Sequence, residues 1–138
     1  MSFREKSAWV TLACFVLVAL IYITHVRDAF SPSPSPWALW VIALCFGAFI
    51  VIEVVAHIVL AIMAPKDART PKDERERLIE LKATRIGAYV FVAGTFLAIL
   101  TPHHGATGFG VAVFVLIAFV VAEIVNYSAR ILYYRRGI

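Results

Sequence analysis

Four long apolar runs constrain the fold of this chain of 138 residues more than any other feature. A helix needs about 20 predominantly apolar residues to cross the hydrocarbon core of a bilayer, and each run is close to that length or longer. We expect helices at about residues 8–26, 37–63, 71–100 and 107–134. The hydrophobic share of 62% and the mean hydropathy of +0.85 are too high for a soluble domain, so the chain is predicted to be an all-α, multi-pass protein of the lipid bilayer.

Helix-breaking segments separate these runs. Three Ser-Pro pairs occupy residues 31–36, and proline at alternate positions prevents a helix from running through because each ring fixes φ and removes an amide donor. The segment 101–107 holds Pro102, two histidines and a glycine, which is typical of a short turn. The four transmembrane helices are therefore predicted to form two antiparallel hairpins.

The basic residues predict the orientation. Of the 13 Lys and Arg residues, all but Arg27 lie near the two termini or in the stretch 64–85. Since cytoplasmic segments of membrane proteins carry an excess of Lys and Arg, both termini and the charged connection 64–82 are expected in the cytoplasm. The net charge of +4 comes from residues beside apolar runs and not from a basic face interleaved with aromatic residues, which favours a membrane surface and excludes nucleic acid as a partner.

Two carboxylates lie inside apolar runs, in the stretches Glu53-Val-Val-Ala-His57 and Glu123-Ile-Val-Asn-Tyr127. Placing an ionisable side chain in a membrane helix costs free energy, so such a residue indicates a polar partner or a functional role. The segments 51–62 and 121–132 align with their glutamates in register, which indicates an internal duplication. Each glutamate lies about 16 residues into its helix, so both carboxylates should reach a similar depth.

These residues predict a polar centre inside the bundle. Its members are Glu53, His57, Glu123, Asn126 and Tyr127, with Arg85, Tyr89 and Arg130 in support. Carboxylates and imidazole suit a divalent metal ion, which makes Glu53, His57 and Glu123 the candidate metal ligands, and titratable side chains in membrane helices also mark proton routes. The alternative is that the same groups only fix helix packing through interhelical hydrogen bonds of about 0.6–2 kcal/mol each.

The connection 64–82 is the most charged part of the chain. Thr70 followed by Pro71 predicts a helix start, with Thr70 as the N-cap and proline at the first helical position. The charged residues that follow are either a solvated collar at the membrane surface or a docking segment for a cytoplasmic protein partner. Its candidate contact residues are Asp73, Glu74, Arg75, Arg77 and Lys82.

Two functional hypotheses follow from these patterns. The first is a membrane protein that binds or conducts a small cation, either a proton or a divalent metal. The second is a non-catalytic structural or regulatory protein that acts through a homo-oligomer or a cytoplasmic partner, and the small-residue pairs Ala43/Gly47 and Gly94/Ala98 favour close helix contacts within or between copies. The sequence contains no nucleophile–base–acid constellation, phosphate-binding glycine loop or Cys-x-x-Cys pair, so an enzyme is not expected.

Three stretches resemble a family of small bacterial membrane proteins with four helices, a domain of unknown function. They are Ser2-Phe-Arg-Glu-Lys-Ser-Ala-Trp9, Asp73-Glu-Arg-Glu-Arg-Leu-Ile-Glu-Leu-Lys-Ala-Thr-Arg85 and Tyr133-Tyr-Arg-Arg-Gly137. The resemblance covers nearly the whole chain, and the middle stretch is its most specific part. It implies a four-helix topology in the bacterial inner membrane and assigns no role to any residue.

Overall fold

The computed structural model describes residues 3–29, 36–65, 71, 73–100, 102 and 108–136. This described part is all-helical and contains four long helices: α1 (Phe3–Ala29), α2 (Pro36–Met63), α4 (Glu74–Leu100) and α5 (Gly108–Arg136). Each of the four has the length and the apolar composition needed to cross a membrane. The prediction of an all-α chain with four membrane-length helices is confirmed.

Two helix starts differ from the predicted ones. Helix α1 begins at Phe3 and not near residue 8, so its first two turns are polar. Helix α4 begins at Glu74 and not at 71, because Asp73 caps it: the Asp73 carboxylate accepts the Glu74 N–H at 2.7 Å, and the Asp73 N–H donates to the Glu76 carboxylate at 3.4 Å. The contact from Glu76 is the half of a capping box in which the N3 side chain accepts the N-cap N–H, and Pro71 lies outside the helix. Thr70, the predicted N-cap, lies outside the described residues.

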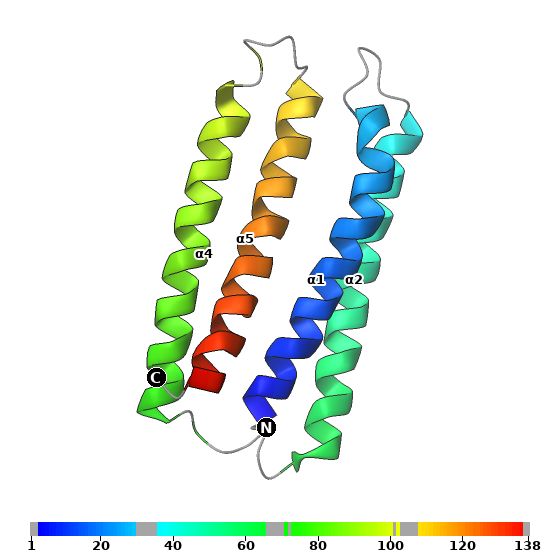
Figure 1. The fold of residues 1–138 in the computed structure, drawn as a ribbon. Helices are drawn as coiled ribbons and strands as arrows, with labels where there is room; N and C mark the ends of the chain where they lie inside the picture. Colours follow the sequence, from blue (N-terminus) through cyan, green and yellow to red (C-terminus); the bar gives the residue numbers. More distant parts are fainter. Residues whose placement is uncertain are drawn as a thin grey trace.

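The helices lie side by side, and each runs opposite in direction to the one before it (Figure 1). Both termini lie at one end of the bundle, which we call the terminal end. Helix α4 packs most extensively against α5, α5 also packs against α1, and α1 packs against α2. The spatial order is therefore α4, α5, α1, α2, with α5 in a central position and α2 at the edge.

The interface between α4 and α5 is close because small residues face each other. A Cβ atom at Gly94 would lie only 2.5 Å from the Ala118 Cβ, and one at Gly87 would lie 3.0 Å from the Asn126 Cβ. Glycine and alanine let two helix backbones approach where a lipid environment provides no hydrophobic driving force between them. The predicted pair Gly94/Ala98 thus serves a contact within the chain, whereas Gly47 has open space beside it.

Aromatic residues fill the interface of α1 with α2 and α5. The ring of Phe15 lies 4.7 Å from that of Phe49, 6.2 Å from that of Phe119 and 6.0 Å from that of Tyr127, measured between centroids. These are the separations at which aromatic pairs attract each other beyond simple area burial. Through Phe15, helix α1 packs against both α2 and α5, the two helices that carry Glu53 and Glu123.

Candidate functional site

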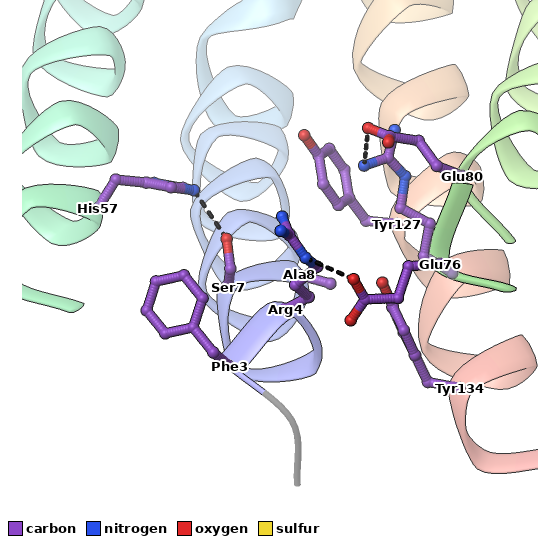
Figure 2. Close-up of a pocket in the computed structure, with 10 residues that line it drawn as sticks. Phe3, Arg4, Ser7, Ala8, His57, Glu76, Glu80, Tyr127 and Tyr134 are labelled. Carbon is purple, nitrogen blue, oxygen red and sulfur yellow. Dashed lines mark hydrogen bonds and ion pairs between the residues drawn. The ribbon is translucent and has the colours of Figure 1, made fainter. Parts of the chain in front are cut away.

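A polar cavity of about 200 Å³ lies at the terminal end of the bundle (Figure 2). All four described helices contribute to its wall. Its charged and polar lining residues are Arg4 and Ser7 from α1, His57 from α2, Glu76 and Glu80 from α4, and Tyr127, Arg130 and Tyr134 from α5. The formal charges of the two arginines and two glutamates balance, so the cavity is polar without a strong net charge.

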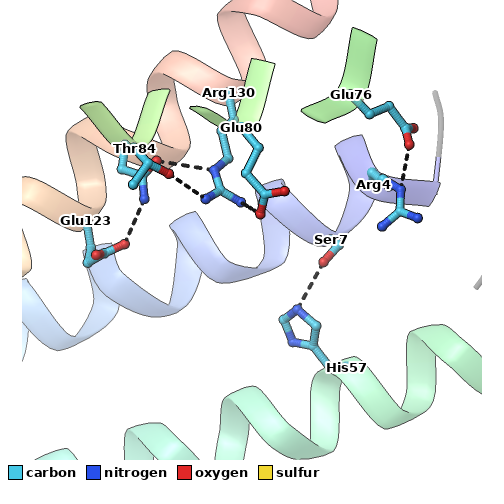
Figure 3. Close-up of polar contacts among 9 residues, drawn as sticks. Arg4, Ser7, His57, Glu76, Glu80, Thr84, Glu123 and Arg130 are labelled. Carbon is cyan, nitrogen blue, oxygen red and sulfur yellow. Dashed lines mark hydrogen bonds and ion pairs between the residues drawn. The ribbon is translucent and has the colours of Figure 1, made fainter. Parts of the chain in front are cut away.

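Arg130 is the most connected side chain of this wall (Figure 3). Its Nη1 contacts Glu80 Oε1 at 3.3 Å, its Nη2 donates to Thr84 Oγ1 at 3.3 Å, and its Nε donates to Asn126 Oδ1 at 3.2 Å. The guanidinium also lies 4.9 Å from the centre of the Tyr127 ring. One side chain of α5 thus binds two groups of α4 and orders its own helix face.

Asn126 extends this network away from the terminal end. Its Nδ2 donates to Glu123 Oε2 at 3.1 Å while its Oδ1 accepts from Arg130. Glu123, Asn126 and Arg130 follow one another at spacings of three and four residues, which places them along one face of α5. A continuous chain of polar contacts therefore runs from Glu80 in the cavity wall to the Glu123 carboxylate.

Two further ion pairs join α1 to the other half of the bundle. Arg4 Nε lies 2.7 Å from Glu76 Oε2 on α4, with both side chains about three-quarters buried (25% and 22% exposed). Arg135 Nε on α5 lies 3.7 Å from Glu5 Oε1, and its guanidinium lies 5.4 Å from the centre of the Trp9 ring. The polar first turns of α1 are helical because these contacts give their charges partners.

His57 joins α2 to α1. Its Nδ1 lies 2.9 Å from the backbone carbonyl oxygen of Glu53, and its Nε2 lies 2.9 Å from Ser7 Oγ. A carbonyl oxygen only accepts, so Nδ1 carries a proton and donates it to the Glu53 carbonyl. The imidazole is thereby held with Nε2 beside the Ser7 hydroxyl at the cavity wall (Figures 2 and 3).

The predicted centre is only partly gathered in one place. Glu123, Asn126 and Tyr127 lie near one another on α5, where the Asn126 amide donates to the Glu123 carboxylate. Among the described residues no three His, Cys, Asp or Glu side chains are grouped so that they could hold a metal ion, so Glu53, His57 and Glu123 do not form the predicted metal site. The reason is the helix order: α2 packs chiefly against α1, and Glu123 is on α5.

Of the three residues predicted to support the polar centre, one lies in the network and two do not. Arg130 takes part in the network, whereas Arg85 and Tyr89 are exposed on α4, Tyr89 at 69%. The buried residues Ile79, Ala83 and Gly87 define the inner face of α4, and Arg85 and Tyr89 point away from it. The predicted contact residues Asp73, Glu74, Arg75, Arg77 and Lys82 are also exposed.

The sequence interpretation missed Glu76 and Glu80 as site residues. Both were counted with the charged collar, although they are four residues apart and share a helix face with Ile79 and Ala83. The apolar positions of that face were the signal that could have found them. Arg4 and Ser7 gave no comparable signal, because both precede the predicted start of the first helix.

Comparison with protein-family models, with curated proteins and with solved structures finds no match for this chain. The resemblance to a family of bacterial four-helix membrane proteins therefore stays a prediction. The functional argument depends on the chemistry of the site.

Proposed function

We propose that this protein is a multi-pass membrane protein that takes up a small cation, namely a proton, at the polar cavity and carries it to Glu53 and Glu123. The observation that carries the proposal is the cavity, lined by all four described helices, together with the polar contacts that run from Glu80 in its wall through Arg130 and Asn126 to the Glu123 carboxylate. Ionisable side chains within membrane helices commonly mark ion or proton pathways.

The position of the cavity supports access from water. Its two acids, Glu76 and Glu80, belong to the first two turns of α4, where charged residues alternate with apolar ones. Beyond Arg85 the outer side of the helix is apolar, as expected where it enters hydrocarbon. The cavity therefore lies at the level of the lipid headgroups, and a proton can reach it without crossing the apolar core.

The two carboxylates lie farther from the terminal end than the cavity. Glu53 precedes His57 by four residues and Glu123 precedes Tyr127 by four, which corresponds to about 6 Å along each helix. Imidazole is a group that can both take up and release a proton, and Nε2 of His57 lies 2.9 Å from Ser7 Oγ at the cavity wall. The order of groups is thus Glu76 and Glu80, then His57, then the inner carboxylates.

Thr11 provides a further polar group along this route. It lies one turn beyond Ser7 on α1, it is only 1% exposed, and Tyr127 in the cavity wall is its polar neighbour.

A proton fits this site better than a metal ion. The cavity carboxylates are already paired with Arg4 and Arg130, and the described residues contain no group of three metal ligands. A proton needs only a connected series of titratable and hydrogen-bonding groups. Metal binding is the second form of the cation hypothesis, and the experiment below distinguishes the two.

We further propose that both termini face the cytoplasm of a bacterium, in its inner membrane, with the chain arranged as two duplicated hairpins. This is supported by the basic residues near the termini and by the matching registers of Glu53 and Glu123. Only 6% of the apolar window of α2 is buried within the chain, which supports a homo-oligomer as the working form.

The test is proton uptake by liposomes that contain the purified protein and a trapped pH-sensitive dye, with a potassium gradient and valinomycin to drive the flux. We expect uptake above that of empty liposomes, and at least about tenfold slower uptake after Glu53→Gln or Glu123→Gln, since positioned groups accelerate proton transfer by 10²–10⁴. Glu74→Gln removes an exposed acid of α4 and is the control that should leave the rate unchanged.

Uptake equal to that of empty liposomes, or an equal loss in the control, would contradict the proposal. Elemental analysis of the same preparations after exposure to divalent metals tests whether the bound cation is a metal ion. Metal retained near one ion per chain, and lost after Glu53→Gln with His57→Ala and Glu123→Gln, would replace the proton by a metal ion.

A further inference from the structure

The outer face of α4 between Arg77 and Arg85 is basic, because the two acids nearest to it, Glu76 and Glu80, turn inward. Glu76 contacts Arg4 on α1, and Glu80 contacts Arg130 on α5. The basic residues Arg77, Lys82 and Arg85 remain exposed on the other side of the helix. The stretch from Arg77 to Arg85 thus presents a positive outer surface, and the exposed acids Asp73 and Glu74 precede it at the helix start.

Apolar side chains are interleaved with these charges. Arg77, Leu81, Arg85 and Tyr89 follow at intervals of four residues and form one row along the helix. Leu81 is 61% exposed and Tyr89 is 69% exposed. Lys82 lies beside this row, so each basic group has an exposed apolar neighbour within one turn.

The row continues into a purely apolar stripe. Beyond Tyr89 the exposed residues of α4 include Val92, Phe96 and Leu97, and no further charge occurs before the helix ends. Tyrosine and basic residues concentrate at the boundary between headgroups and hydrocarbon in membrane proteins. This pattern places Lys82 and Arg85 among the headgroups and the apolar stripe among the acyl chains.

We propose that this face of α4 is a binding site for one anionic phospholipid. The guanidinium of Arg85 and the ammonium of Lys82 contact the lipid phosphate, and Arg77 contacts the anionic headgroup beyond it. A guanidinium can bind two phosphate oxygens at once, and polybasic segments at a cytoplasmic membrane surface attract anionic lipids. The acyl chains lie along Tyr89 and Phe96.

The arrangement favours a lipid over an acidic protein partner. The ligand must offer negative charge at the level of Lys82 and Arg85, and an apolar part that extends from there toward the membrane interior. A phospholipid has this form, whereas a cytoplasmic protein would leave the apolar stripe beyond Tyr89 without a partner. The proposal does not depend on proton transfer at the cavity.

The test compares phosphatidylglycerol with phosphatidylcholine as added lipids, and counts the lipids bound to the detergent-solubilised full chain by native mass spectrometry. The wild type should bind phosphatidylglycerol at least about tenfold more strongly, because three cationic groups near one headgroup each contribute to the attraction. The variant Arg77→Gln/Lys82→Gln/Arg85→Gln should lose this preference.

The matched control is Lys6→Gln/Arg135→Gln/Arg136→Gln, which removes the same charge from exposed positions of α1 and α5 at the same end of the bundle. It should keep the preference. An equal loss in both variants, or no preference in the wild type, would overturn the site. If the α4 variant is not helical by circular dichroism, Arg85→Gln replaces it, with Lys6→Gln as its control and the same contrast expected.

Discussion

Glu123 on α5 and Glu53 on α2 occur in the same sequence pattern, four residues before an aromatic or imidazole ring, yet their surroundings differ. The Glu123 carboxylate accepts a hydrogen bond from Asn126, which in turn is held by Arg130. The Glu53 side chain has no hydrogen bond or ion pair within the described residues, and only its backbone carbonyl is engaged, by His57. The same pattern thus produces one fixed carboxylate and one that is free to change its contacts.

The number of neighbouring helices explains the difference. Helix α5 packs against both α4 and α1, whereas α2 packs chiefly against α1. In the apolar windows of the two helices, 28% of the α5 residues and 6% of the α2 residues are buried. A carboxylate on a helix with two neighbours finds partners from the chain itself, whereas one on an edge helix has fewer groups of the chain within reach.

The largest expected loss of stability comes from a substitution on α5. Arg130→Met removes the contact with Glu80 and the hydrogen bonds to Thr84 and Asn126, so we expect a loss of about 3 kcal/mol in the free energy of unfolding. The measurement is unfolding by dodecyl sulfate followed by circular dichroism. Arg135→Met is the control on the same helix: this side chain is 63% exposed, and its loss should cost less than about 1 kcal/mol. Equal effects would show that the Arg130 network does not hold α5.

Helix packing provides the next contrast. Gly94→Ala places a methyl group 2.5 Å from the Ala118 Cβ, which forces α4 and α5 apart at an expected cost of about 2 kcal/mol. Gly47→Ala on α2 meets nothing within 4 Å and should be neutral, or stabilising by up to about 1 kcal/mol because alanine favours a helix. The same unfolding assay measures both. A clear destabilisation by Gly47→Ala would mean that another surface covers the outer face of α2, as a homo-oligomer would.

The smallest effect concerns the contact between α2 and α1. Ser7→Ala removes the hydroxyl bonded to His57 Nε2, and a single partly exposed hydrogen bond contributes about 0.5–1 kcal/mol. We therefore expect a small loss of stability, together with slower proton uptake in the liposome assay. Thr24→Ala is the control, because that hydroxyl donates to the Ile21 carbonyl of its own helix. If Ser7→Ala slows uptake no more than Thr24→Ala does, the Ser7–His57 contact is not on the proton route.

Contacts within one helix could be predicted from the sequence. Glu123, Asn126 and Arg130 follow at fixed spacings, and the geometry of a helix places such residues on one face whatever surrounds it. The predicted start of α4 is wrong by three residues because Pro71 is typical of a first helical position, whereas in the structure Asp73 caps the helix through contacts with Glu74 and Glu76. In both cases only neighbouring residues of the chain decide the result.

Contacts between helices could not be predicted in this way. The pairs Arg130–Glu80, Arg4–Glu76 and Ser7–His57 join residues 46 or more positions apart, and they exist only because the helices take the order α4, α5, α1, α2. The metal site predicted from Glu53, His57 and Glu123 required a direct packing of α2 against α5, and α2 lies at the edge of the bundle instead.

The sequence by itself determined that this chain has four membrane-length helices, because the length and apolarity of a run decide whether it can cross a bilayer. It also determined which polar residues share a helix face. Only the tertiary structure decided which acids are paired and which faces are exposed, since that depends on the side from which each helix is covered. Close packing of glycine and alanine between α4 and α5 turns Glu76 and Glu80 inward, whereas Glu53 lies on α2, which packs chiefly against α1.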